Sequence, residues 1–230
     1  MKRLIVLYAT VSLIAFIFSG TTFAQEDEVG KNHYSIFGAF SKPTGDFGDD
    51  IGEDAGMAKT GFGAGIEYNY AFDVPGLYWV TSFALILNGY DDTDIKEELA
   101  DEFWQYDVDV KVGRYYNFPW LTGIKYQKQV SPKLHVYGMG QIAFNFAMFP
   151  GIEVTVDGES GEISTDFSSS YGFAVGGGVI LEDKFNFGLR IYSLGEAETD
   201  VVIDVAGESE PFGTWQQPIS MILITAGINF

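Results

Sequence analysis

From His33 onward, apolar and polar side chains alternate at every second position in eight separate stretches of the chain. A side-chain period of two predicts β-strands, because successive side chains of a strand point to opposite faces. The stretches are punctuated by Gly, Pro, Asn and Asp, which favour turns. The eight predicted strands cover residues 33–41, 60–72, 77–90, 115–127, 134–148, 167–181, 185–194 and 217–230.

The two faces of each predicted strand differ in kind. One face is bulky and often aromatic, as with Phe62, Ile66 and Tyr70, whereas the other is small or polar, as with Gly65 and Asn69. A soluble sandwich would turn its large residues into a core and its charged residues toward water. We therefore expect the bulky faces to contact lipid and the small, polar faces to line a narrow, wet interior.

The connectors between the predicted strands alternate in length. Three are short (73–76, 130–133 and 183–184) and four are long (42–59, 91–114, 149–166 and 195–216). Short turns on the periplasmic side and long loops on the extracellular side are typical of outer-membrane barrels. The pattern predicts an all-β fold, an eight-stranded antiparallel up-and-down transmembrane β-barrel, over residues 33–230.

The start of the chain has the pattern of a secretory signal peptide. Lys2 and Arg3 precede an apolar run from Leu4 to Phe18, and Thr22-Phe23-Ala24 places small residues at a cleavage site. The run is shorter than the ~20 apolar residues of a membrane-spanning helix. We expect a cleaved signal peptide at 1–24 and a short periplasmic segment at 25–32, followed by the barrel domain at 33–230.

Charge and cysteine content narrow the function classes. The net charge is −19, which becomes −21 when Lys2 and Arg3 are removed with the signal peptide. A chain this acidic lacks the basic footprint of a nucleic-acid-binding protein. The four long connectors hold 25 of the 32 acidic residues, so the predicted strands carry few charges. The absence of cysteine rules out disulfides, and a closed hydrogen-bonded barrel in lipid supplies stability in another way.

Three charged residues fall on the inward face of the predicted strands. Glu67 lies about five positions above its periplasmic turn, and so does Arg190, which at ~3.3 Å per residue gives the two a similar depth. Lys125 also faces inward, somewhat lower. A buried charge needs a partner, so we expect Glu67 to pair with Arg190 or with Lys125 and to plug the interior. The alternative is that both basic groups reach water at the periplasmic mouth.

At the level of strands and loops, residues 32–230 resemble the small outer-membrane β-barrel proteins, the eight-stranded porin-like or opacity-type family of Gram-negative bacteria, Bacteroidetes in particular. The resemblance is carried by Pro43 to Gly48, by Phe118 to Tyr126 and by Ile222 to Phe230. It implies that the terminal Phe230, with Ile228, Ile224 and Ile222, forms an assembly signal for the barrel assembly machinery. It also implies contact with outer-membrane lipid and lipopolysaccharide.

Little in the sequence points to chemistry. Gly61 to Gly65 is glycine-rich but lacks the Lys and Ser/Thr of a phosphate-binding loop, and Asp91 to Asp94 lacks the spacing of a calcium loop. A helix is predicted from Ile95 to Phe103, since Asp94 and Glu97 form a capping box. We expect no catalytic residue, cofactor or dedicated metal site.

These observations favour a non-enzymatic outer-membrane barrel, not an open pore, with a structural or surface-interaction role for its acidic loops. Two alternatives stay open. One is a lipid A-modifying barrel enzyme, although His33 and His135 are expected at the periplasmic ends of their strands, away from the outer leaflet. The other is a secreted, soluble, lipocalin-like binding barrel. The ligand of the loops is not indicated by the sequence.

Overall fold

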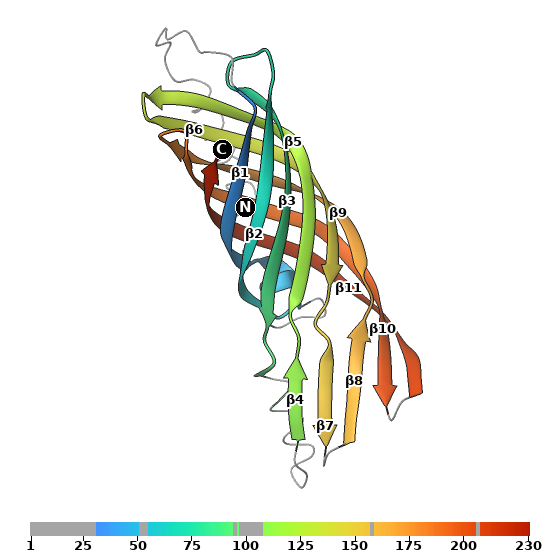
Figure 1. The fold of residues 1–230 in the computed structure, drawn as a ribbon. Coiled ribbons are helices and arrows are strands. Elements are labelled where there is room, and N and C mark those ends of the chain that lie inside the picture. Colours follow the sequence, from blue (N-terminus) through green and yellow to red (C-terminus); the bar gives the residue numbers. More distant parts are fainter. Residues whose placement is uncertain (1–30, 51–54, 94–95, 97–107, 157–158, 206–207) are drawn as a thin grey trace, which may run out of the picture.

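The computed structural model describes residues 31–50, 55–93, 96, 108–156, 159–205 and 208–230. These residues form eleven strands in one antiparallel sheet and one short 3-10 helix (Figure 1). Within them, no helix is long and apolar enough to cross a membrane. The elements are β1 (His33–Pro43), η1 (Gly45–Gly48), β2 (Ala58–Ala71), β3 (Leu77–Tyr90), β4 (Val108–Val112), β5 (Tyr115–Ser131), β6 (Leu134–Met148), β7 (Ile152–Val156), β8 (Glu159–Thr165), β9 (Ser168–Leu181), β10 (Phe185–Val205) and β11 (Glu208–Asn229).

All strands except β4, β7 and β8 close into a ring. Each of these eight strands pairs with two neighbours in the order β11-β1-β2-β3-β5-β6-β9-β10, and β10 pairs again with β11. Closure occurs between the first and last strands, where Ser35 lies opposite Asn229 and Pro43 opposite Met221. A closed ring leaves no unpaired strand edge in lipid, so the predicted eight-stranded antiparallel barrel is confirmed.

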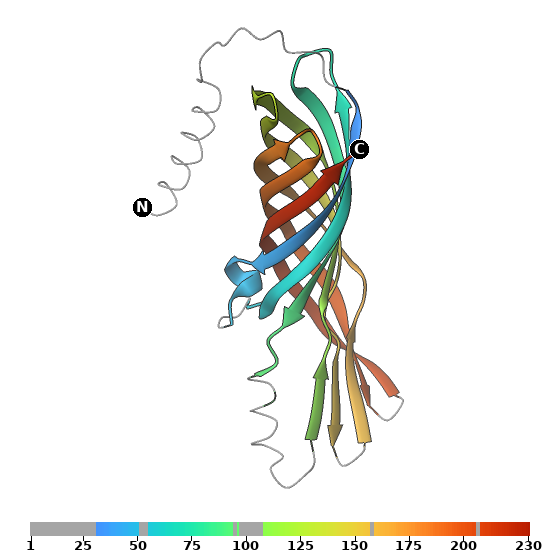
Figure 2. The ribbon, with the colours of Figure 1, turned by 60° about the vertical axis from the view of Figure 1, so that its left-hand side comes forward.

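The barrel wall continues beyond the membrane on one side, which the sequence analysis did not predict. Strands β4, β7 and β8 lie in stretches interpreted as loops, and β10 and β11 continue to Val205 and from Glu208, through the connector predicted at 195–216. β8 pairs with the far part of β10, β7 with β8, and β4 with β7, so the five strands form one extracellular sheet (Figures 1 and 2). These stretches were predicted as long connectors between strands, and they hold most of the acidic residues. In the sheet, Glu153, Glu162 and Asp204 share one face, where contact with water permits charge.

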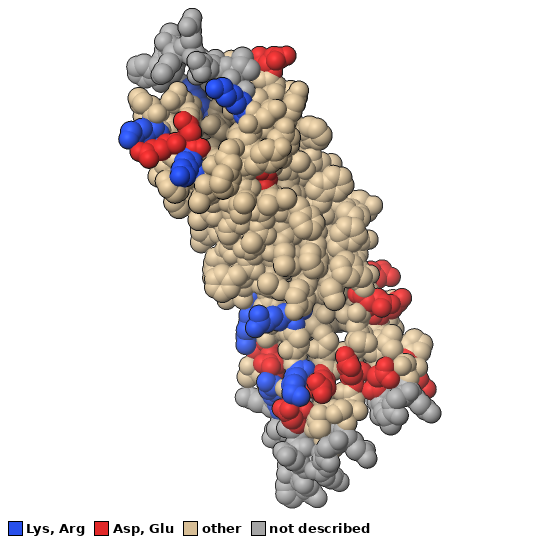
Figure 3. Space-filling model, in the orientation of Figure 1, with Lys and Arg blue, Asp and Glu red and all other residues tan. Residues whose placement is uncertain are grey.

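The outside of the barrel is apolar. The outward positions of β2 carry Phe62, Ile66 and Tyr70, which are 70%, 60% and 46% exposed. Figure 3 shows a broad, mostly uncharged band between charged groups at the two ends of the molecule. Apolar side chains in this number are stable only against lipid, so the band marks the membrane-spanning part and excludes the soluble lipocalin-like alternative.

The inside of the barrel differs from the wet interior that we expected. Polar residues do face inward, but toward the extracellular end the buried Asn88, Asn117 and Asn145 lie beside a cluster of buried apolar side chains. Its buried side chains include Ile86, Leu121, Leu194, Met221 and Leu223. The expectation was incomplete because large buried side chains, among them Ile86, Leu121 and Met221, share the inward faces with the Gly, Ser and Asn residues.

Several predictions concern residues outside the described part of the chain. These are the signal peptide at 1–24, nearly all of the periplasmic segment at 25–32, and the helix at 95–103 apart from Lys96. They stay predictions. Strand boundaries differ in smaller ways, since β5 continues to Ser131 and leaves only Pro132 and Lys133 as the turn before β6.

Candidate functional site

A cluster of three charged side chains crosses the barrel interior. The Arg190 Nη2 atom lies 2.8 Å from Glu67 Oε2, and the Lys125 Nζ atom lies 3.1 Å from Glu67 Oε1. All three side chains are between 0% and 2% exposed. The sequence analysis expected Glu67 to pair with one of the two cations, and the structure brings all three together. Neither cation reaches water at the periplasmic mouth.

The cluster holds two cations but one carboxylate, and other side chains complete it. Asn69 donates a hydrogen bond of 3.2 Å to Glu67 Oε1. The Lys125 Nζ atom lies 4.5 Å from the centre of the Tyr137 ring, and the Arg190 Cζ atom lies 4.5 Å from that of Phe37. Cation–π contacts of desolvated groups contribute about 2 kcal/mol each, so the aromatic faces partly replace a second carboxylate.

The alternation of the strands and one glycine allow this arrangement. Glu67, Lys125 and Arg190 all occupy inward positions of strands that are not neighbours in the ring. Gly176 of β9 lies directly opposite Arg190 of β10. A Cβ atom on Gly176 would lie 3.1 Å from the Arg190 Cγ atom, which is tighter than ordinary packing. Glycine at this position therefore leaves room for the guanidinium to cross the interior.

The extracellular mouth of the barrel is closed by aromatic rings. Phe47 of η1 is fully buried, and its ring centre lies 5.0 Å from that of Tyr115. Phe149 lies 5.8 Å from Tyr115 and 5.2 Å from Trp215. The Tyr115 hydroxyl donates a 2.8 Å hydrogen bond to the Gly56 carbonyl, which ties the segment after η1 to the cap. We call Phe47, Tyr115, Phe149 and Trp215 the aromatic cap.

The aromatic cap was not predicted from the sequence. Phe47 was noted only as part of the Pro43 to Gly48 motif, and Phe149 and Trp215 were placed in loops. Buried aromatic residues in predicted loops are a signal that could have pointed to it, because a solvated loop has no reason to retain them. The cap and the ion cluster are two separate side-chain clusters inside the barrel.

The extracellular sheet has an acidic face and a mainly apolar face, although Glu210 lies opposite Ile203 on the latter. Val154, Ile152, Ile163 and Ile203 lie on the face that continues the inside of the barrel. On the other face, Glu153 is paired in register with Glu162, and Glu162 with Asp204. Three carboxylates in directly adjacent positions repel one another and destabilise the sheet. Among the described residues, this row of carboxylates makes only a long ion pair with Lys111 of β4, whose Nζ atom lies 3.7 Å from Glu153 Oε2.

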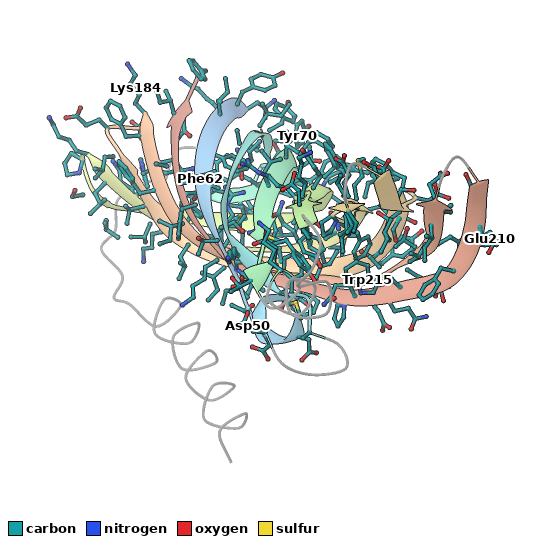
Figure 4. All side chains as sticks on the ribbon, turned by 90° about the horizontal axis from the view of Figure 1, so that it is seen from below. Asp50, Phe62, Tyr70, Lys184, Glu210 and Trp215 are labelled. Carbon is teal, nitrogen blue, oxygen red and sulfur yellow. The ribbon has the colours of Figure 1, made fainter. Side chains whose placement is uncertain are left out.

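The hairpin of β10 and β11 extends away from the barrel (Figure 1). Figure 4 shows Glu210 near its end and Trp215 closer to the barrel. Phe212, at an irregularity in the pairing of the two strands, is 75% exposed. The hairpin thus presents acidic groups and one aromatic ring to the medium.

The predicted assembly signal lies at the closure of the barrel. Ile224, Ile228 and Phe230 are 59%, 39% and 71% exposed on the lipid-facing side, and Ile222 shares their face. The Phe230 amide donates a 2.8 Å hydrogen bond to the Tyr34 carbonyl, and the Tyr34 amide returns one of 3.2 Å. The position suits a terminal signal, and its role in assembly stays a prediction.

The two histidines lie at the end of the barrel that carries the short turns. His33 is the first residue of β1, and His135 is the second residue of β6, with its Nδ1 atom 2.9 Å from an Asp183 carboxylate oxygen. This is where the sequence analysis placed them. Within the described residues, no three His, Asp or Glu side chains gather closely enough to hold a metal ion.

Comparisons with known proteins show likeness in structure and none in sequence. No protein-family model matches the chain, and no curated protein matches it. Neisserial surface protein A is 15% identical, with a TM-score of 0.50 over 86% of this chain and 95% of that one. A major outer membrane protein of Thermus thermophilus and OprG of Pseudomonas aeruginosa are each 11% identical, with TM-scores of 0.47 and 0.46; they cover 87% and 86% of this chain and are themselves covered over 100% and 96%.

At such identities, the likeness concerns the fold. This chain has the fold of the small outer-membrane β-barrel proteins. The closed ring of strands and the apolar band around it make it an integral membrane protein, and barrels of this kind span the outer membrane.

Proposed function

We propose that this protein is a closed, non-enzymatic barrel of the outer membrane that presents an acidic β-sheet to partners with a basic surface. The observation that carries the proposal is the row of Glu153, Glu162 and Asp204. Like charges in register cost stability. A basic partner would relieve this repulsion on binding, and complementary charge would speed its approach.

The closed interior supports a surface role rather than transport. The ion cluster crosses the interior, and the aromatic cap lies toward its extracellular end. An eight-stranded barrel is only wide enough for its own side chains. The reconstituted protein should therefore leave a planar bilayer as resistive as the bilayer without protein. Steady ion conductance through the wild type would contradict the closed-barrel part of the proposal.

The surface role can be tested with a fluorescent polylysine probe on proteoliposomes that expose the extracellular side. A variant with Glu153→Gln, Glu162→Gln and Asp204→Asn should bind the probe at least five-fold more weakly than the wild type at low salt. The matched control neutralises three acidic residues of the periplasmic turns, Asp73, Glu182 and Asp183, which removes the same net charge. Equal weakening by both triple variants would show a general charge effect and would contradict a site on the sheet.

A further inference from the structure

One part of the lipid-facing surface is hollowed. Gly38 of β1 pairs in register with Ala64 of β2 and with Ala226 of β11, so three small residues lie side by side on the outward face. Phe40, Phe62 and Ile224 form the next outward row, and Phe187 of β10 lies beside Ala226. They surround a hollow of about 470 Å³ lined by Gly38, Phe40, Phe62, Phe187, Ile224 and Ala226, with backbone from the intervening residues.

The hollow is empty of protein. A Cβ atom built on Gly38 would meet no atom within 4 Å. Around it, Phe62 (labelled in Figure 4) is 70% exposed and Ile224 is 59% exposed, so their side chains stand out from the wall. The hollow is shallow and open toward the lipid. Because it lies within the membrane-spanning band, its occupant must be hydrocarbon.

A cation lies at the outer boundary of the same surface. Lys42 follows Gly38 and Phe40 on the outward face of β1 and is exposed. It lies four residues from Gly38, which is about 13 Å along a strand. Among the described residues, no carboxylate lies within ion-pair distance of Lys42, whereas the neighbouring Lys59 is engaged with Asp91 at 2.9 Å. A lysine at a membrane boundary reaches into the headgroup layer, where it attracts phosphate.

We propose that this surface binds one lipopolysaccharide molecule, with an acyl chain in the hollow and a lipid phosphate on Lys42. The choice of lipid follows from position. Lys42 is at the end of β1 that carries the long loops, which is the extracellular end, and the outer leaflet there is built of phosphorylated glycolipid. The inference rests on the membrane placement of the barrel and is independent of the partner of the extracellular sheet.

The test is native mass spectrometry of the protein extracted from outer membranes in a mild detergent. Wild type should retain one glycolipid adduct. Gly38→Leu fills the hollow, and Lys42→Gln removes the cation while keeping a polar side chain. Each substitution should reduce the adduct at least ten-fold. The matched control is Gly140→Leu on β6, another outward glycine whose added Cβ meets nothing within 4 Å, and it should keep the adduct.

The outcomes separate the possible explanations. A folded barrel is first verified from its faster gel migration without heating, and Ala226→Phe fills the same hollow from β11 in case Gly38→Leu does not fold. An adduct that persists in the hollow-filling variants overturns the site. An adduct of phospholipid mass in place of glycolipid, with the same dependence on Gly38, overturns the proposed lipid. Equal loss in Gly140→Leu would show that any bulk on the barrel wall disturbs lipid retention, and that also overturns the proposal.

Discussion

The Arg190 Nη2 atom lies 2.8 Å from Glu67 Oε2, although 123 residues separate the two in the chain. In the ring, β11 and β1 stand between their strands, and β3 stands between β2 and the strand of Lys125. The cluster therefore connects three strands that share no backbone hydrogen bonds. It fixes the cross-section of the barrel from the inside.

Removing the single carboxylate should destabilise the barrel strongly. In Glu67→Gln, Lys125 and Arg190 stay buried without a counter-charge, and breaking a buried ion pair in this way costs about 3–5 kcal/mol. We expect a corresponding decrease in the free energy of unfolding, measured by urea titration in lipid vesicles. The control is Glu182→Gln, which breaks an exposed pair with Lys133 at 2.8 Å and should cost less than about 1 kcal/mol. Similar decreases in the free energy of unfolding of the two variants would show that the buried ion pairs of Glu67 add nothing to the stability of the barrel.

Two glycines in neighbouring strands should respond in opposite ways to the same substitution. A Cβ atom on Gly123 of β5 would point inward, 2.7 Å from the Gln141 Cα atom and closer still to the Gly140 carbonyl oxygen. Gly123→Ala forces these backbones apart, and overpacking of this kind costs about 1–3 kcal/mol. Gly140→Ala points into open space and should be neutral or slightly stabilising. The two variants are compared by their unfolding midpoints in lipid vesicles. An unchanged midpoint in Gly123→Ala would show that the added methyl group does not force β5 and β6 apart.

The aromatic cap should depend on Phe47 most of all. Phe47→Ala leaves a cavity among Tyr115 and its neighbours, and a truncation of this size costs about 3–5 kcal/mol. Deuterium exchange of the segment around η1 should become faster, because the segment loses its buried anchor. Phe212→Ala is the control, since that ring is 75% exposed and its loss should change stability by less than about 0.5 kcal/mol. Unchanged exchange in Phe47→Ala would mean that the cap does not hold this segment.

Deletion of Phe230 should lower the amount of assembled barrel. The deletion removes two backbone hydrogen bonds to Tyr34 and the outermost ring of the last strand. We expect several-fold less heat-modifiable protein in the outer membrane at equal synthesis. Phe230→Tyr retains the backbone and the ring and should assemble normally. Normal assembly of the deletion variant would remove Phe230 from the proposed signal.

The barrel itself could be predicted from the sequence because its rules are local. A period of two, an aromatic outward face and alternating connector lengths are sufficient to define eight strands and their direction. The inward position of Glu67, Lys125 and Arg190 follows from the same period, since each residue has bulky outward neighbours such as Ile66 or Ile124. Depth along the strand predicts a similar level for Glu67 and Arg190 and a somewhat lower one for Lys125, and the structure brings all three into contact.

The extracellular part could not be predicted in this way because the outward face of its strands is charged instead of apolar. In Ala197 to Val205, the alternation is present, but Glu198, Asp200 and Asp204 occupy the face that lipid covers lower down. Above the membrane, that face contacts water and charge is permitted. These stretches lack the bulky, apolar outward face of the predicted strands, and they were predicted as connectors. The aromatic cap escaped prediction for a related reason, since its members come from four separate segments and meet only in three dimensions.

The pairing of β1 with β11 has a consequence for biogenesis. The Ser35 hydroxyl donates a hydrogen bond to Asn229, which lies 194 residues later in the chain. β1 can therefore pair with β11 only after the last strand has entered the barrel. Until then, β1 exposes an open edge that a bilayer cannot solvate. The nascent barrel must therefore wait, unclosed, in an environment that shields this edge, and the slowest step of its maturation should be the arrival of its final strand. Long-range closure of this kind is intrinsically slow.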